Sequence, residues 1–284
     1  MLEVFPPRKK DVLIFDSHGS EDIQKILPKN SFSTLFVRYE KFNLFILLKT
    51  FLKFNFRLRD YLKTYIEYVR PKILITTIDN NIFFYQIDFK FLKKISIQNA
   101  RRTGIPEDIF FNIKKKKLKL FSDYLFVHND SIASLYKKYI KSKIYSTGSL
   151  RSNFQPIKKN FIYKLGYVST YRNRDYNDKL YKNYFYGDFR KSEIILINHL
   201  KRYSKEKNIK LAVLGCVTED WQNEKNFYDR ILGKNYQFIK NSLDRNTYSL
   251  IDKFEILTGI DSTLVYENFG RGNKTAFFSY RSMK

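Results

Sequence analysis

Hydroxyl and carboxylate side chains follow an apolar run near the end of the chain. Ser262 and Thr263 come shortly after the run Phe254–Gly259, and Glu267 lies four residues after Thr263, one helical turn further on the same face. Ser262 or Thr263 can cap the helix that follows, whose free N–H groups attract phosphate. Glu267 can accept hydrogen bonds from a ribose diol. This spacing predicts a nucleotide site, and the alternative is an ordinary helix cap with a solvent-facing glutamate.

Short apolar runs alternate with helical patterns along the whole chain, which is typical of parallel α/β architecture. The expected strands are Val12–Asp16, Thr34–Arg38, Ile73–Asp79, Lys94–Gln98, Tyr124–Asn129, Ile144–Thr147, Leu165–Ser169, Lys210–Gly215, Tyr236–Lys240, Phe254–Gly259 and Thr275–Ser279. The expected helices are Asn43–Val69 with a break near Asn55, Asn81–Leu92, Ile109–Phe121, Ser131–Ile140, Lys191–Lys205, Glu224–Leu232, Thr247–Lys253 and Leu264–Phe269. Strands buried on both faces carry ligand-binding loops at their carboxyl ends. The alternation therefore predicts two tandem Rossmann-like domains.

A boundary between these domains is expected where the composition changes to that of a linker. The segment Pro156–Asn160 carries Pro, Lys and Asn after the Gly148–Asn153 turn. We therefore expect an N-terminal domain over residues 1–155 and a C-terminal domain over residues 156–284.

The charge is strongly positive, with 53 Lys and Arg against 28 Asp and Glu and a formal net charge of +25 among 284 residues. Such an excess is typical of proteins that bind phosphates, anionic lipid or nucleic acid, although a Lys-rich solvated surface is the plain alternative. The segment Phe42–Leu58 carries Lys49, Lys53 and Arg57 at four-residue spacing among Leu and Phe, which predicts a basic amphipathic helix on an anionic membrane surface. No apolar run is long enough to span a membrane, so a cytoplasmic location is expected.

Several classes of protein are disfavoured by missing motifs. A single cysteine, Cys216, and three scattered histidines offer neither a disulfide framework nor a zinc site. The chain has no Asp-x-Asp pair for a metal-bound diphosphate, no Walker motif, no Gly-x-Ser-x-Gly elbow and no Gly-x-Gly-x-x-Gly after the first strand. We therefore expect no cofactor and no metal.

The series Asp261-Ser262-Thr263-x-x-x-Glu267, Gly270-x-Gly272 and Phe277-Phe278-Ser279 resembles the donor-binding region of bacterial surface-polysaccharide transferases of the GT-B type, those of capsule, lipopolysaccharide and O-antigen synthesis. Further likeness lies in Asp16–Gly19, Thr77–Asn81, Ser96–Asn99, Gly148-Ser149 and Tyr167–Arg172. The resemblance implies two Rossmann-like domains facing a cleft, the second holding a nucleotide-sugar and the first an acceptor. GT-B proteins usually continue with helices after the last strand, so the second domain is expected to lack its final helices.

The resemblance also implies roles for individual residues. Ser262 and Thr263 would bind donor phosphate, Glu267 the ribose, and Ser169, Thr170 and Arg172 the nucleotide from the opposite wall, where Arg172 offers a fixed charge to a diphosphate.

The catalytic base is expected in the loop after the first strand, where an imidazole or carboxylate can take a proton from an acceptor hydroxyl. His18 and Asp16 are the candidates. Acceptor contacts are expected from residues after the third and fourth strands: Asp79, Asn80, Gln98 and Asn99. All of these residue types also occur as ordinary turn residues.

The activity implied is a metal-independent glycosyltransferase that moves a sugar from a nucleotide-sugar to a surface glycan or lipid-linked acceptor. A nucleotide-sugar epimerase or a polyol-phosphate transferase would use the same scaffold. A basic nucleic-acid-binding protein is disfavoured because the aromatic residues lie inside apolar runs, and an inactive homologue is the remaining alternative.

Overall fold

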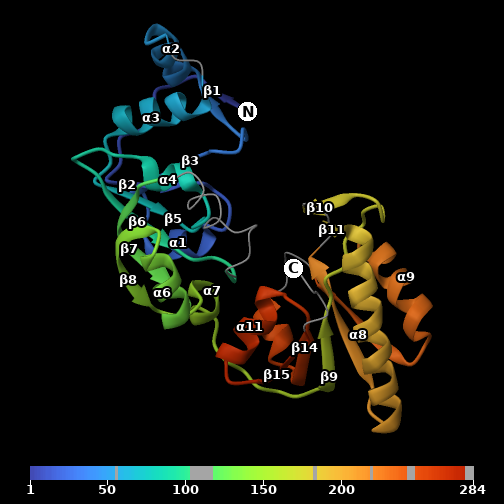
Figure 1. Ribbon diagram of the computed structural model, residues 1–284. Coiled ribbons are helices and arrows are strands. Elements are labelled where there is room, and N and C mark those ends of the chain that lie inside the picture. Colours follow the sequence, from blue (N-terminus) through green and yellow to red (C-terminus); the bar gives the residue numbers. More distant parts are fainter. Residues whose placement is uncertain (55–56, 103–117, 182–183, 218–219, 242–246, 279–284) are drawn as a thin grey trace. The chain divides into compact units, whose positions relative to one another are not determined.

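The computed structural model describes the chain except for residues 55–56, 103–117, 182–183, 218–219, 242–246 and 279–284. The chain divides into two compact units, Met1–Phe154 and Gln155–Lys284, which we call unit 1 and unit 2. The boundary lies one residue before the one expected from the linker composition. Each unit is a parallel sheet with helices on both faces, so the α/β class with two Rossmann-like domains is confirmed (Figure 1).

Unit 1 contains a sheet of six parallel strands in the order β3-β2-β5-β6-β7-β8. Its strands are β2 (Val12–Phe15), β3 (Phe32–Leu35), β5 (Ile73–Thr76), β6 (Lys93–Ile97), β7 (Leu120–Val127) and β8 (Ile140–Ser146). The chain adds β3 on one side of β2 and all later strands on the other. The order therefore reverses between β2 and β5, and ligands of open α/β sheets bind outside the carboxyl ends at such a reversal.

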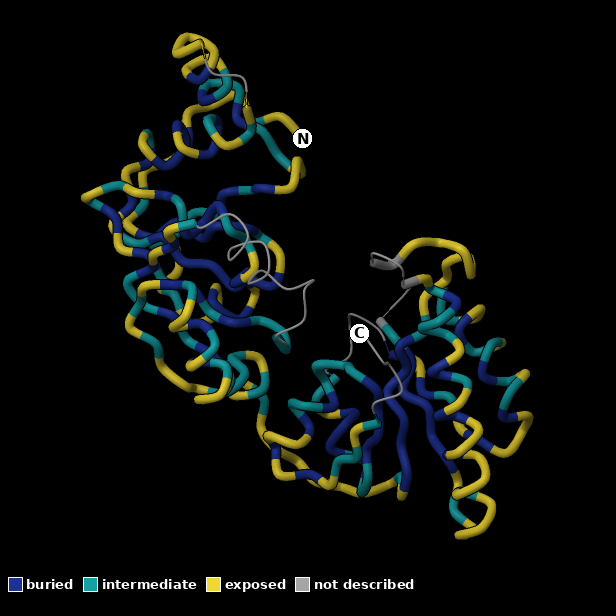
Figure 2. Tube along the Cα trace, in the orientation of Figure 1, coloured by how far each residue is buried: buried dark blue, intermediate teal, exposed yellow. Residues whose placement is uncertain are grey.

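Apolar side chains cover both faces of the unit 1 sheet. The larger core joins the strands to α3 (Leu58–Val69), α4 (Ile82–Gln86) and α6 (Asp130–Lys137), and it includes the fully buried Phe15, Phe84 and Tyr136. The smaller core places Ile14 and Ile75 against α1 (Glu21–Ile26), with α7 (Leu150–Asn153) beside it. Figure 2 shows the strands as the most buried part of the unit.

The segment expected to form one basic amphipathic helix is divided in the structure. β4 (Phe42–Asn43) pairs with the short strand β1 (Leu2–Glu3), and α2 (Leu44–Leu52) follows directly. Phe54 then adopts a left-handed backbone with φ +54°, which ends the helical path before α3 begins at Leu58. The prediction of a continuous helix from Phe42 to Leu58 is therefore wrong, although the break near Asn55 was expected.

Unit 2 contains five parallel strands in the order β13-β12-β9-β14-β15. They are β9 (Tyr163–Val168), β12 (Leu211–Val217), β13 (Tyr236–Asn241), β14 (Phe254–Gly259) and β15 (Lys274–Phe277). The strand order reverses between β9 and β14, so the carboxyl ends of these two strands define the expected ligand position.

Helices pack on both faces of the unit 2 sheet. α8 (Tyr186–Glu206) and α9 (Trp221–Leu232) cover one face over Tyr167 and Val213. α10 (Thr247–Ile251) and α11 (Thr263–Gly270) cover the other face over Leu214 and Leu257. A two-stranded ribbon of β10 (Lys179–Tyr181) and β11 (Tyr184–Phe185) precedes α8.

Several of the expected elements differ from the structure in their bounds. The strand expected over Ile144–Thr147 begins at Ile140, and the helix expected over Ser131–Ile140 ends at Lys137. The helix expected over Asn81–Leu92 covers only Ile82–Gln86, because the chain turns extended at Ile87. Most of the helix expected over Ile109–Phe121 lies outside the described residues, and Phe121 itself belongs to β7. The last strand ends at Phe277, and Ser279 lies outside the described residues.

Candidate functional site

The strand-order reversal of unit 2 brings together two sets of residues that are far apart in the sequence. Ser169, Thr170 and Arg172 follow β9, whereas Ser262 and Thr263 follow β14. Because β9 and β14 are paired neighbours in parallel register, these two loops leave the same edge of the sheet. We call this the carboxyl edge of unit 2.

The start of α11 has the geometry expected of a phosphate site. Ser262 occupies the cap position with an extended backbone, but its side chain makes no capping hydrogen bond to the helix. The hydroxyl of Ser262 therefore does not occupy the first-turn N–H groups, of which that of Val265 donates to the carbonyl of Ser262 at 3.1 Å. Glu267 lies one turn further along α11 and is half-buried. Val265 and Asn268 lie on the buried face of the helix, and both are 0% exposed.

The first residues of the loop after β9 are buried and held by hydrogen bonds. Ser169 and Thr170 are buried. Thr170 donates both its backbone N–H (3.0 Å) and its hydroxyl (3.2 Å) to the carboxylate of Glu193 on α8. Ser169 Oγ accepts the N–H of Tyr171 at 3.1 Å. The side chains of Ser169 and Thr170 therefore shape the loop, and only Arg172 of the three expected residues is exposed.

Arg172 lies between the loop after β9 and the end of β12. Its Nη1 donates to the carbonyl of Tyr171 at 2.7 Å and to Cys216 Sγ at 3.1 Å. Burial and the nearby charge of Glu224 raise the pKa of the Cys216 thiol to about 11, so the sulfur is a neutral thiol near pH 7.

The strand-order reversal of unit 1 places Asp16 and His18 as expected, but their surroundings differ. Asp16 is buried, with a left-handed backbone of φ +79°. Its carboxylate accepts the N–H of His18 at 3.0 Å and pairs with Arg38 Nε at 2.9 Å. Those contacts fix the turn after β2 and occupy Asp16. The imidazole of His18 is exposed and, among the described residues, has no hydrogen bond or ion pair.

Asp79 after β5 is fully buried and makes an ion pair. Arg102 Nε and Nη2 contact its two carboxylate oxygens at 2.9 and 2.6 Å, and the hydroxyl of Tyr136 donates to the same group. Because this carboxylate is buried and already paired, it cannot contact an acceptor substrate, which is the role expected of Asp79.

The other residues expected to contact the acceptor substrate also differ in their exposure to solvent. Gln98 is 2% exposed, donates to the carbonyl of Ala100 at 2.7 Å and accepts the N–H of His128 at 2.9 Å, so it holds the strand ends together. Asn99 is half-buried and its side-chain oxygen accepts from Arg102 at 3.1 Å. Asn80 is exposed and is left as the open acceptor candidate.

Glu193, Glu224 and Arg102 were not identified from the sequence. A signal for Glu193 exists: Leu196, Ile197 and Leu200 follow it at helical spacing on the buried face of α8. Arg102 gives no such signal, because its partner Asp79 lies 23 residues away.

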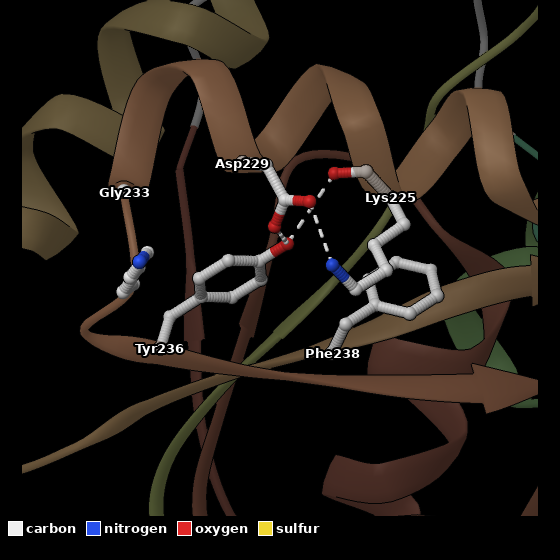
Figure 3. Close-up of a pocket in the computed structure, with 6 residues that line it drawn as sticks. Lys225, Asp229, Gly233, Tyr236 and Phe238 are labelled. Carbon is white, nitrogen blue, oxygen red and sulfur yellow. Dashed lines mark hydrogen bonds and ion pairs between the residues drawn. The ribbon is translucent and has the colours of Figure 1, made fainter.

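A separate depression of about 560 Å³ lies beside α9 and the start of β13 (Figure 3). Asp229 accepts from Lys225 Nζ at 2.6 Å and from the hydroxyl of Tyr236 at 2.7 Å, and Lys225 is the main cause that lowers the pKa of Asp229. Because β13 begins at Tyr236, the depression lies at the amino ends of the strands, away from the carboxyl edge. Two of its charged groups, Lys225 and Asp229, are already paired with each other.

Two properties bear on metals and membranes. In the described part of the chain, no three His, Cys, Asp or Glu side chains are grouped so that they could hold a metal ion. Within the same residues, no helix has both the length and the apolar character needed to cross a bilayer.

Comparison with solved structures defines the class of protein. S. aureus MnaA in its UDP co-structure is 15% identical with a TM-score of 0.56, and the match covers 96% of this chain and 80% of that chain. The wall teichoic acid polymerase TagF is 14% identical with a TM-score of 0.52, covering 96% and 71%. The UDP-GlcNAc 2-epimerase from Neisseria meningitidis, bound to UDP-GlcNAc, is 12% identical with a TM-score of 0.50, covering 100% and 84%. The chain therefore has the GT-B fold.

The family follows from the sequence match. A family model described as "putative O-antigen biosynthesis protein" matches residues 95–284, more than half of the chain. The chain belongs to this family, which confirms the expected likeness to surface-polysaccharide proteins of the GT-B type. No curated protein sequence matches the chain significantly.

Proposed function

We propose that this protein is a glycosyltransferase that moves a sugar from a nucleotide-sugar to an acceptor in O-antigen or related surface-polysaccharide synthesis. The observation that carries the proposal is the placement of Ser262, Thr263 and Glu267 at the strand-order reversal of unit 2. Ligands of doubly wound sheets bind at this position. Membership of an O-antigen biosynthesis family supports the substrate class.

The start of α11 would bind the donor diphosphate through its first-turn N–H groups and the uncommitted hydroxyl of Ser262. Glu267 would accept hydrogen bonds from the ribose. Arg172 would offer a fixed positive charge to the departing diphosphate from the β9 side. The similar structures solved with UDP and with UDP-GlcNAc support a nucleotide-bearing donor on this fold.

His18 would be the catalytic base in unit 1. Its imidazole is exposed at the carboxyl end of β2, whereas Asp16 is buried in its pair with Arg38. An exposed imidazole can take the proton of an acceptor hydroxyl near neutral pH. Asn80 would contact the acceptor from the neighbouring β5 loop.

The reaction would need no metal. Helix N–H groups and an arginine carry out the charge stabilisation that a divalent cation supplies in other nucleotide-sugar transferases. The absence of an Asp-x-Asp pair from the sequence supports this proposal.

The test is a thermal-shift screen of the full chain against UDP, CMP, CDP, GDP and their sugars, with a chelator present. A ligand at about 100 times its Kd adds about 2.7 kcal/mol to the stability of the folded state. We expect one nucleotide to raise the Tm of the wild type and of Glu255→Ala, but not of Glu267→Ala. Glu255 is the control because it lies on β14 in an exposed pair with Lys274. No shift with any nucleotide contradicts the proposal.

An epimerase or a polyol-phosphate transferase is the alternative on the same scaffold, supported by the likeness to the 2-epimerase and to the teichoic acid polymerase. Product analysis with the nucleotide-sugar found in the screen separates the three activities. A glycosidic bond to an added acceptor supports the transferase. A free isomeric nucleotide-sugar identifies an epimerase, and a phosphodiester identifies a polyol-phosphate transferase.

The site of action would be the cytoplasmic face of an anionic membrane. Leu48, Phe51 and Leu52 lie at i, i+3 and i+4 on α2 and are 54%, 49% and 80% exposed, so the apolar face of this helix points to solvent (Figure 2). Lys49 and Lys53 lie beside them on the same segment. An exposed apolar stripe flanked by lysines is typical of helices that lie in the headgroup region of a bilayer.

A further inference from the structure

Two buried carboxylates lie behind the carboxyl edge of unit 2, and neither is among the proposed donor contacts. Glu193 on α8 is 1% exposed and Glu224 on α9 is 0% exposed. In the part of the chain that the structure describes, neither carboxylate has a cation partner, since the ion pairs of unit 2 involve other residues. Uncompensated buried carboxylates are costly unless hydrogen-bond donors surround them.

Glu193 is surrounded by such donors. Its Oε1 accepts the hydroxyl groups of Tyr167 and Tyr228 at 2.7 and 2.6 Å, and the backbone N–H and hydroxyl of Thr170 at 3.0 and 3.2 Å. Burial raises the pKa of Tyr228 well above its usual value, so this hydroxyl stays protonated and can donate. The bonds to Thr170 tie the loop after β9 to α8.

Glu224 does the same for the end of β12. Both of its carboxylate oxygens accept the N–H of Cys216, at 2.9 and 3.2 Å. Gly215 allows this approach, because a Cβ there would lie 3.2 Å from Glu224 Oε2 and 2.8 Å from the ring of Phe238. The loop after β9 and the end of β12 are therefore each held by a buried carboxylate, from α8 and α9 respectively.

Ser169 and Tyr228 connect the two carboxylates into one network. Ser169 Oγ lies 2.7 Å from the hydroxyl oxygen of Tyr228, which in turn donates to Glu193. Burial raises the pKa of Glu224, the charge of Glu193 adds to this, and a hydrogen bond from Ser169 opposes it. The two carboxylates therefore share hydrogen-bonding partners behind the ends of β9 and β12.

Arg172 contacts both of these segments. One of its contacts is the carbonyl of Tyr171, in the loop held by Glu193, and the other is the sulfur of Cys216, at the end of β12 held by Glu224. Arg190 of α8 adds a second tie, since its Nη2 donates to the carbonyl of Arg174 at 2.8 Å. The position of the Arg172 guanidinium is therefore set by buried groups that do not themselves reach the surface.

We propose that Glu193 is a positioning residue for the nucleotide donor: through Thr170 it holds Arg172 where the diphosphate binds, and Glu224 fixes the neighbouring end of β12. The inference rests on the proposed function of this edge. Displacing a charged group by about 1 Å costs large factors in binding and rate, so a buried support of this kind sets donor affinity without touching the donor.

The test compares Glu193→Gln with Asp229→Asn in the full chain. Asp229 is the matched control because it is also a carboxylate of unit 2 that accepts from a tyrosine hydroxyl, but at the amino ends of the strands. UDP and CDP are titrated calorimetrically into each protein at a temperature where all are folded. We expect Glu193→Gln to weaken the binding of the nucleotide that wild type prefers about tenfold, and Asp229→Asn to stay within about twofold.

Amide hydrogen exchange of residues 167–174 supplies a second measurement. We expect faster exchange in Glu193→Gln than in wild type or Asp229→Asn, because the N–H of Thr170 loses its charged acceptor. Where Glu193→Gln does not fold, Thr170→Val removes only the hydroxyl bond and should weaken nucleotide binding about threefold.

The outcomes separate the two proposals. Unchanged affinity in Glu193→Gln, or in Thr170→Val where that variant is needed, overturns the positioning role and leaves the proposed function intact. Equal losses in Glu193→Gln and Asp229→Asn also overturn it, since they reflect general destabilisation. If the wild type binds neither UDP nor CDP, the inference is overturned, and so is the proposal of a UDP or CDP donor. A response to GDP or CMP in the thermal screen preserves the proposed function.

Discussion

Arg271 and Asp252 form a buried ion pair in which Nη2 lies 2.7 Å from Oδ2 and Nε lies 3.1 Å from Oδ1. The same two side chains bind the first residues of unit 2. Asp252 accepts the N–H of Lys158 at 2.9 Å, and Arg271 donates to the carbonyls of Gln155 and Pro156 at 3.2 and 3.1 Å. The pair therefore fastens the beginning of unit 2 to α10 and α11.

Removing the cation should destabilise unit 2 strongly. Arg271→Met leaves Asp252 buried and unpaired, a change that costs about 3–5 kcal/mol. The single tryptophan, Trp221, lies in unit 2 and reports its unfolding in urea. Lys274→Met is the control, because it removes only an exposed pair with Glu255 and should cost less than about 1 kcal/mol.

The cost of Arg271→Met should depend on pH. Burial by itself raises the pKa of Asp252, but the hydrogen bonds from Arg271 and from the N–H of Lys158 outweigh it and lower the pKa below the usual value. The stabilisation is therefore present above the unfolded pKa of about 4 and is lost as the pH falls through the folded pKa. The difference between wild type and Arg271→Met should shrink below about pH 4. A difference that stays constant would contradict this account.

Lys94 predicts a pH dependence of the stability of unit 1 in a higher pH range. Its ammonium group is buried and donates to the carbonyls of Tyr85 and Ile87 at 2.9 and 2.5 Å. Burial lowers the pKa of Lys94 to about 8. The unfolded chain then binds more protons above pH 8, so the stability of unit 1 should rise with pH from about 8 towards 10, by up to about 3 kcal/mol. Urea unfolding followed by circular dichroism should show this rise in wild type and a flat profile in Lys94→Met.

The strands of the core could be predicted from the sequence because parallel strands buried on both faces are continuous apolar runs. Phe254–Gly259 matches β14 residue for residue, and Val12–Asp16 exceeds β2 by one residue. The division between α2 and α3 was harder to predict. Lys49, Lys53 and Arg57 recur at helical spacing, but the left-handed backbone at Phe54 depends on how α2 packs against α3.

The candidate site could be predicted where the chemistry follows a strand directly. Ser262, Thr263 and Arg172 lie at strand ends, which the apolar runs locate. Burial of polar side chains was not predictable in the same way. Gln98 and Asp79 have the residue types of sugar-binding groups, yet their side chains are occupied by contacts with His128 and Arg102, which come from other loops.

His18 should affect turnover more than binding if it is the base. His18→Gln removes the proton acceptor, and general-base catalysis contributes about 10²–10⁴-fold to rate. We expect kcat to fall at least about 100-fold while nucleotide affinity stays within about twofold. His199→Gln, an exposed imidazole on α8, serves as the control. Unchanged turnover in His18→Gln would exclude this residue as the base.

The outward face of α2 should govern membrane binding. Vesicles containing phosphatidylglycerol should sediment wild-type protein but release Leu48→Ser/Leu52→Ser, because about 1.5–3 kcal/mol of transfer free energy is lost for each leucine. Ile195→Ser is the control, since Ile195 is an exposed apolar residue of α8. Binding should weaken in high salt if the lysines contribute. Equal sedimentation of the double variant and the wild type would mean that α2 is not the docking element.

Ser262→Asp should change stability and donor binding in opposite directions. A carboxylate at the start of α11 interacts favourably with the helix dipole and can cap the first-turn N–H groups, which the serine side chain does not. The gain is about 0.5–1 kcal/mol, so the Tm of unit 2 should rise by a few degrees. The same charge occupies and repels the place of a donor phosphate, so nucleotide affinity should fall at least about tenfold. Ser262→Ala, which adds no charge, should weaken nucleotide binding far less and leave the Tm almost unchanged. A rise in Tm without loss of nucleotide binding would place the diphosphate elsewhere on unit 2.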